Sequence, residues 1–157
     1  MPAAALILGE EKIPALLSAY LVAKRSDTDY PFPSSTALPI YAGPLRDSTR
    51  RAYPCLEIWC TSFSLPELRD HEDYEVSLDL HSDQTGTVAA ETSTLATLRY
   101  HLANTRFTDY LATLSTNDKS GWAIRAAWMT GGEFLVDPQD RRTIRRTTMR
   151  VAFRSQT

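Results

Sequence analysis

Polar and apolar positions alternate most regularly in segment 74–82 of the chain. Every second residue there is apolar and the residues between are polar, which is the pattern of a β-strand with one buried face. The apolar set is Tyr74, Val76, Leu78 and Leu80, and the polar set is Glu75, Ser77, Asp79 and His81. The pattern predicts a strand whose apolar set packs on the core and whose polar set points outward.

Three other segments place apolar residues at helical spacing. A helix is predicted at about 10–24, and a second one begins near Thr87 and carries a stripe of leucines. A third helical piece is predicted at about 105–115, where Asn104 or Thr105 suits the N-cap. These three helices interrupt a chain that otherwise has the pattern of strands.

Further strands are predicted on both sides of the second helix. Segment 53–63 is apolar on both faces, as expected of a central strand. The remaining strand segments are 38–43, 122–129, 133–136 and 143–154, and the "TGG" between the second and third of these predicts a hairpin turn or a bulge.

The order of helix, strands, helices and strands indicates an α+β fold. We expect a mixed, mostly antiparallel sheet packed by one or two helices, in a single domain over residues 1–157. Proline residues in segment 26–39 predict an extended loop, and the sequence leaves open whether it is ordered.

Net charge and apolar runs give no reason to expect a nucleic-acid-binding, secreted or membrane-spanning protein. A net charge of -2 gives no general reason to expect binding to nucleic acid or membranes. The apolar run at 3–8 is too short for a secretion signal and has no basic residue before it. No stretch approaches the ~20 apolar residues of a membrane span. We therefore expect a soluble protein made without export.

Cys55 and Cys60 lie five positions apart in one predicted strand. An odd separation places them on opposite faces, with their Cα atoms roughly 16 Å apart at about 3.3 Å per residue. A disulfide needs Cα atoms within about 7 Å, so the two are not expected to pair with each other. They are expected to be packed thiols in a reducing cytoplasm.

Asp79, His81 and Asp83 have ligand-type side chains on one strand face and are the candidates for a metal site. Neighbours on that face stand about 7 Å apart, so the strand supplies two ligands at best. A solvated or subunit-contacting face is the interpretation we favour. A small metal-dependent enzyme that uses these three residues is the alternative from a different class.

Motifs for other chemistry are missing from the sequence. There is no G-x-S-x-G, and the pair Gly131 and Gly132 is not followed by a helix or a lysine, as a phosphate-binding loop would require. We therefore expect no enzymatic activity, no catalytic residue, no metal and no cofactor.

Acidic and basic residues are separated along the chain. Segment 67–83 has seven acids against Arg69, and six arginines follow Asp140 with no acid among them. Such a separation suits subunits whose acidic and basic surfaces meet head to tail, and pairing of the two strands within one molecule uses the charges equally well. The candidate interface residues are Glu75, Asp79, His81, Asp83, Arg141, Arg142, Arg145, Arg146, Arg150 and Arg154.

Element order and several local features resemble the tail terminator proteins of long-tailed bacteriophages, also called tail completion or neck proteins. A short N-terminal helix and a loop lead to a strand that opens with an aromatic residue and proline, "YPCLEIW". A strand that ends in "LHSDQ" precedes the helix "TVAAETSTLATLRYHL", and the chain closes on "GGEFLVDPQDRRTIRRTTMRVAFR". The resemblance covers about residues 10–155 and contains no diagnostic motif.

The resemblance implies a structural virion protein of the neck, made in the host cytoplasm. Such a protein forms a homo-oligomeric ring, a hexamer in the family, that caps the tail tube and joins it to the head-side connector. Its partners are other copies of itself, the tube protein, the connector or stopper protein, and DNA passing through the lumen. The acidic strand at 75–83 and the basic strand at 143–154 would contact other subunits or line that lumen. Another head–tail adaptor, a stopper or a tube-associated subunit is the near alternative.

Overall fold

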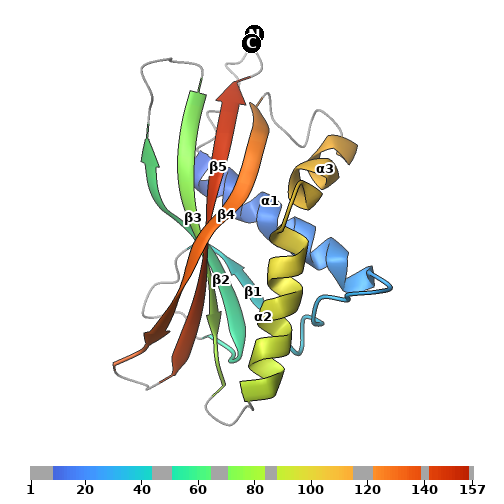
Figure 1. The fold of residues 1–157 in the computed structure, drawn as a ribbon, viewed down its shortest axis with the longest axis vertical. Coiled ribbons are helices and arrows are strands. Elements are labelled where there is room, and N and C mark those ends of the chain that lie inside the picture. The colour runs from blue at the N-terminus through green and yellow to red at the C-terminus, as the bar shows by residue number, and fades with distance from the viewer. Residues whose placement is uncertain are drawn as a thin grey trace.

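A computed structural model of the chain shows one five-stranded sheet and three α-helices (Figure 1). It describes residues 9–43, 51–64, 71–83, 88–114, 122–138 and 142–155. The elements are α1 (Gly9–Ala23), a short 3-10 turn η1 (Lys24–Ser26), β1 (Ile40–Ala42), β2 (Cys55–Ser64), β3 (His71–His81), α2 (Val88–Leu102), α3 (Arg106–Thr113), β4 (Trp122–Val136) and β5 (Thr143–Ser155).

The strands lie in the order β1-β2-β3-β5-β4. β1 runs parallel to β2, and every other neighbouring pair is antiparallel. This confirms the predicted α+β class with a mixed, mostly antiparallel sheet. The last strand, β5, is inserted between β3 and β4, so the two longest ladders both involve the C-terminal segment.

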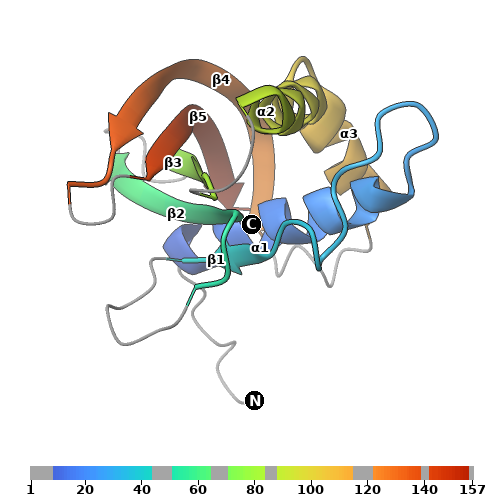
Figure 2. The same ribbon diagram turned by 90° about the horizontal axis from the view of Figure 1, so that it is seen from below.

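The three helices pack on one face of the sheet. In Figure 2, α1 lies along β1 and β2, while α2 and α3 lie beside β4. Tyr20 of α1 joins the helices, because its hydroxyl donates a hydrogen bond of 2.6 Å to the carbonyl oxygen of His101 and its ring packs 5.3 Å from that of Phe107. The apolar set of β3 faces these helices and is 0–4% exposed, as the alternation predicts.

The Pro-rich loop is ordered by one arginine. Arg25 donates hydrogen bonds to the carbonyl oxygens of Pro33, at 2.7 Å, and Leu38, at 2.9 Å. Phe32 and Leu38 are each 2% exposed and belong to the core. The loop therefore closes one end of the hydrophobic core.

β4 is one strand, so the bulge rather than the turn describes the "TGG" segment. The register against β5 shifts between Met129 and Gly131 and then continues regularly to Val136. Gly132 allows a close approach here, because a Cβ atom would lie 2.8 Å from a guanidinium nitrogen of Arg99 on α2. An uninterrupted β5 keeps both halves of β4 in one ladder.

Candidate functional site

The polar residues of β3 are mostly buried, although no described helix covers their face. Ser77 is 1% exposed, Asp79 4% and His81 6%, and Glu57 on the neighbouring strand is 6% exposed. The expectation of a solvated face is therefore wrong for Asp79 and His81, whereas Glu75 is exposed as predicted. Alternation tells on which side a residue lies but not what covers that side. Here long side chains from other segments provide the cover.

Asp79 and Arg146 form the centre of this layer. They stand opposite each other in the β3–β5 register, and Arg146 donates from Nε to Oδ1 at 2.8 Å and from a terminal nitrogen to Oδ2 at 3.0 Å. The indole nitrogen of Trp59 donates to the same Oδ2 at 3.2 Å. The hydrogen bonds that Arg146 donates to Asp79 raise the pKa of Arg146 above its ordinary value. Such two-point pairs are strong and fixed in geometry.

Glu57 lies beside Asp79 on β2 and has its own arginine. Its Oε2 is 2.7 Å from a terminal nitrogen of Arg51. Burial raises the pKa of Glu57, while Arg51 acts in the opposite direction. Two neighbouring buried carboxylates are thus each faced by a guanidinium. The charged cluster, as we call Arg51, Glu57, Asp79, His81 and Arg146, comes from β2, β3, β5 and the segment before β2.

The ring nitrogen Nε2 of His81 has no hydrogen-bond partner among the described residues, and neither has Nε of Arg51. The His81 ring lies 6.0 Å from the ring of Tyr53, over which Arg142 stacks at 3.6 Å. Burial lowers the pKa of His81, and the positive charge of Arg51 lowers it further. The imidazole is therefore neutral at pH 7.

Glu57, Asp79 and His81 offer three ligand-type atoms within 4.8 Å of one another. Two carboxylates and an imidazole suit a divalent transition metal by donor type. Two arginines, however, already hold the carboxylates and supply the positive charge that a metal would bring. The cluster thus works as an ion-pair network within the sheet, and a metal would have to displace Arg146 or Arg51.

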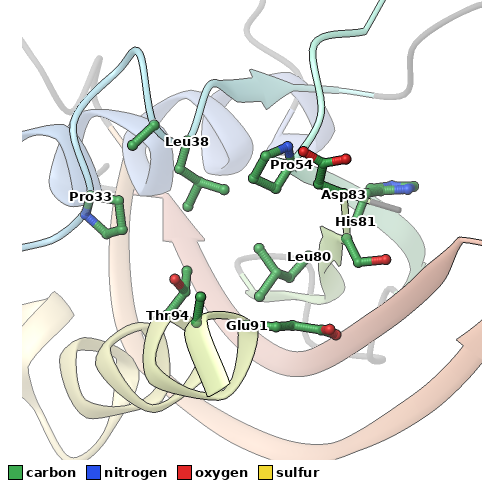
Figure 3. A pocket seen from close by; sticks show the side chains of 11 residues that line it. Pro33, Leu38, Pro54, Leu80, His81, Asp83, Glu91 and Thr94 are labelled. Carbon is green, nitrogen blue, oxygen red and sulfur yellow. The ribbon is translucent and has the colours of Figure 1, made fainter. Parts of the chain in front are cut away.

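Asp83, the third ligand of the predicted metal site, lies just past the end of β3 and is not part of the group Glu57, Asp79 and His81. It lines a cavity of about 230 Å³ between the Pro-rich loop, the end of β3 and the start of α2. Figure 3 shows Asp83 near Pro54 at one end of this cavity, with Glu91 of α2 below and the apolar Leu38 and Leu80 in its wall. His81 also lines this cavity and Asp79 does not, so the predicted set Asp79, His81 and Asp83 does not meet at one point.

The C-terminal arginines do not form one basic surface. Arg145 is on the helix side, where it contacts Glu91 at 3.3 Å and stacks over Phe134 at 4.4 Å. Arg146 is on the other side, and Arg150, also on that side, is exposed opposite Glu75. Arg154 stands opposite His71 in the ladder, with its side chain outside the description, and Arg141 lies outside the described residues.

The sequence interpretation missed two members of the charged cluster, Arg51 and Glu57, and two aromatic residues that contact it, Tyr53 and Trp59. Glu57 left a signal, because it is an acid within the otherwise apolar run "CLEIWC" and such a residue needs a partner when buried. Arg51, Tyr53 and Trp59 gave no such signal, because the residues next to them in the sequence do not indicate which strand their side chains contact.

Comparisons with known proteins do not assign the chain to a family. No family model matches the sequence, and no curated protein matches it either. Among the described residues, no helix is both long and apolar enough to span a membrane. A functional proposal for this chain has to rest on its residues and their geometry.

Asp79→Ala is expected to destabilise the fold by about 2–3 kcal/mol, because the partly buried Arg146 guanidinium loses its two charge-assisted hydrogen bonds. Urea unfolding followed by circular dichroism measures the change. The double variant Asp79→Leu with Arg146→Met removes both charges and should recover most of the loss. Glu75→Ala is the matched control on the same strand, and its effect should stay below about 1 kcal/mol. Equal effects of Asp79→Ala and Glu75→Ala on the unfolding free energy would show that the Asp79–Arg146 pair does not stabilise the fold.

His81 should make stability depend on pH in a defined direction. Its folded-state pKa lies below the ordinary value of 6.5, so the unfolded chain takes up the proton first as the pH falls. The contribution of neutral His81 is complete above 6.5 and is lost as the pH falls below it, with a slope of at most about 1.4 kcal/mol per pH unit.

The comparison with His81→Gln isolates this effect, because Glu57 and the other carboxylates titrate in both proteins. The difference in unfolding free energy between wild type and variant should shift against the wild type from pH 7 to pH 5. Parallel curves over this range would show that His81 is not held neutral in the folded state.

Proposed function

We propose that this chain is a structural subunit of the tail terminator kind, which forms a ring on the end of a bacteriophage tail tube and joins it to the head-side connector. Its partners in this role are further copies of itself, a tail tube protein and a connector or stopper protein, with DNA passing through the lumen. The protein then acts in the neck of the virion through its contacts rather than through catalysis.

One observation carries the proposal: the outermost strand β4 exposes large apolar side chains. Trp128 is 43% exposed, Phe134 54% and Val136 55%. β4 pairs with β5 on one side only, among the strands that the structure describes. Long apolar edge strands promote association between chains, and exposed apolar patches mark protein contacts. In an assembly, such an edge would be covered by a neighbouring subunit.

Two further features support the proposal. The order of one helix, three strands, two helices and two strands fits the outline of tail terminator proteins on which the resemblance is based. Each carboxylate of the charged cluster is paired with an arginine of the same molecule, so these residues serve the sheet itself. Of the charged residues first considered for subunit or lumen contacts, Glu75 and Arg150 are exposed and suited to that purpose.

A head-side adaptor or stopper would use the same kind of surface. Cross-linking in virions separates the two roles, because a terminator contacts both the tube protein and the connector. Contacts confined to the head side would favour the adaptor or stopper.

Val136→Lys is expected to convert the ring into monomers, because lysine on an exposed edge strand opposes edge-to-edge pairing. Light scattering should give the wild type about six times the chain mass of 17.6 kDa and the variant close to a single mass. Val22→Lys is the matched control, since Val22 is 45% exposed on α1, away from β4. A wild type that stays monomeric at every concentration would contradict the proposal, and ring-shaped particles in electron micrographs would support it.

The three-ligand group Glu57, Asp79 and His81 favours a metal-dependent enzyme as a second candidate. Calorimetric titration of the purified protein with Zn²⁺ or Mn²⁺ should show no stoichiometric binding, because Arg51 and Arg146 hold the carboxylates. Binding of one metal per chain that is lost in His81→Ala would favour the enzyme over the ring.

A further inference from the structure

The sheet has a second uncovered rim besides β4. β1 pairs with β2 only over the three residues Leu56, Glu57 and Ile58. Beyond them, residues 59–64 of β2 have β3 on one side and no described strand on the other. In Figure 1 this half of β2 forms the upper left border of the sheet, the first half of β4 forms the upper right border, and β4 ends at the lower left. Among the described strands, one chain thus carries two rims without a strand partner on one side, at the two ends of the strand order.

The two rims run in opposite directions. β2, β3, β5 and β4 are neighbours in that order, and each pair is antiparallel, so three reversals make β4 antiparallel to β2. Within one copy, residues 130–136 of β4 lie level with the part of β2 that β1 covers, and residues 126–129 lie level with residues 60–64 of β2. When two copies stand in the same orientation and are offset along the strands, residues 130–136 of one copy therefore meet residues 59–64 of the next in the antiparallel sense. Antiparallel pairs are the commoner and slightly more stable kind.

The side chains at the rims fit such a contact. Phe134 and Val136 stand opposite Arg145 and Thr143, on the helix side of the sheet. On the β2 rim, a hollow of about 390 Å³ is lined by Cys60, Thr61 and Ser62 together with Glu10 of α1. Since Cys60 pairs with the core residue Val76, this hollow opens on the helix side as well.

We propose that copies of this chain join head to tail by antiparallel pairing of residues 130–136 of β4 with residues 59–64 of β2 in the next copy. Phe134 and Val136 then enter the hollow beside Glu10 and Cys60, and the sheets form one continuous ladder around the assembly. A contact between two different surfaces closes into a ring when the rotation between copies allows it. This inference rests on the proposed ring and specifies the contact that builds it.

Cysteine pairs test the contact directly, because a disulfide forms only between Cα atoms within about 7 Å. One set of variants carries Thr130→Cys or Glu133→Cys on β4, and a second set carries Thr61→Cys or Ser62→Cys on β2. All four positions are exposed. Each β4 variant is mixed with each β2 variant under mild oxidation, and intact-protein mass spectrometry identifies the cross-linked species.

Wild-type protein is the control for the native cysteines. Burial raises the pKa of Cys55 and of Cys60 to about 12, so both thiols are protonated and unreactive at pH 8. The wild type should remain uncross-linked under the same conditions. A variant that carries one cysteine on each rim should give a ladder of covalent oligomers on a non-reducing gel, ending at the ring size.

Mixed disulfides between a β4 variant and a β2 variant are the expected result. Disulfides only between two β4 cysteines would overturn the inference in favour of a two-fold β4–β4 contact. A ring of about six chains by light scattering without any of these disulfides would also overturn it, while the proposed function would stand. Monomers at every concentration, with no disulfide, would remove the proposed function together with the contact.

Discussion

The pairing of β3 with β5 through Asp79 and Arg146 determines how the rest of the sheet is arranged. These residues are separated by 67 positions, and their two hydrogen bonds fix the register of the central ladder. A slip of one residue would turn Arg146 toward the helices and Met149 away from the core. Because β4 pairs with β5, the position of the outer rim follows from this register. The inner core and the outer edge thus share one register, which this ion pair and the apolar pairs beside it, such as Val76 with Met149, hold together.

Because Asp79 and Arg146 pair within one molecule, contacts between molecules have to use other residues. The separation of acids and bases along the sequence suggested either subunit contacts or pairing within the chain, and for Asp79 and Arg146 the structure shows the second. A buried pair that is complete within one chain has little to offer a neighbour. Among the described strands, β4 and the outer part of β2 leave backbone without a strand partner on one side, and Phe134 and Val136 stay exposed.

The sequence pattern predicted those features of the fold that depend on neighbouring residues alone. The alternation in β3 identified Tyr74, Val76, Leu78 and Leu80 as core residues, and helical spacing found all three helices within a few residues of their ends. The burial of His81 was not predictable, because its cover comes from Tyr53 and Arg142, which belong to other segments. The sequence also could not show whether the "TGG" of β4 forms a turn or a bulge, because this depends on whether β5 pairs with both halves of β4.

The exposed apolar residues of β4 are hard to reconcile with a protein that acts alone. Natural edge strands are usually short, charged or covered, because an unprotected edge recruits other chains. Here residues 130–136 include the apolar Phe134, Leu135 and Val136, and Glu133 is the only charge among them. Glu133 lies in line with Arg146 on the face away from the helices, so it protects the helix side of the edge poorly. An edge of this kind suits a defined neighbour whose strand covers it, and a closed ring gives every copy such a neighbour without leaving an edge at the end.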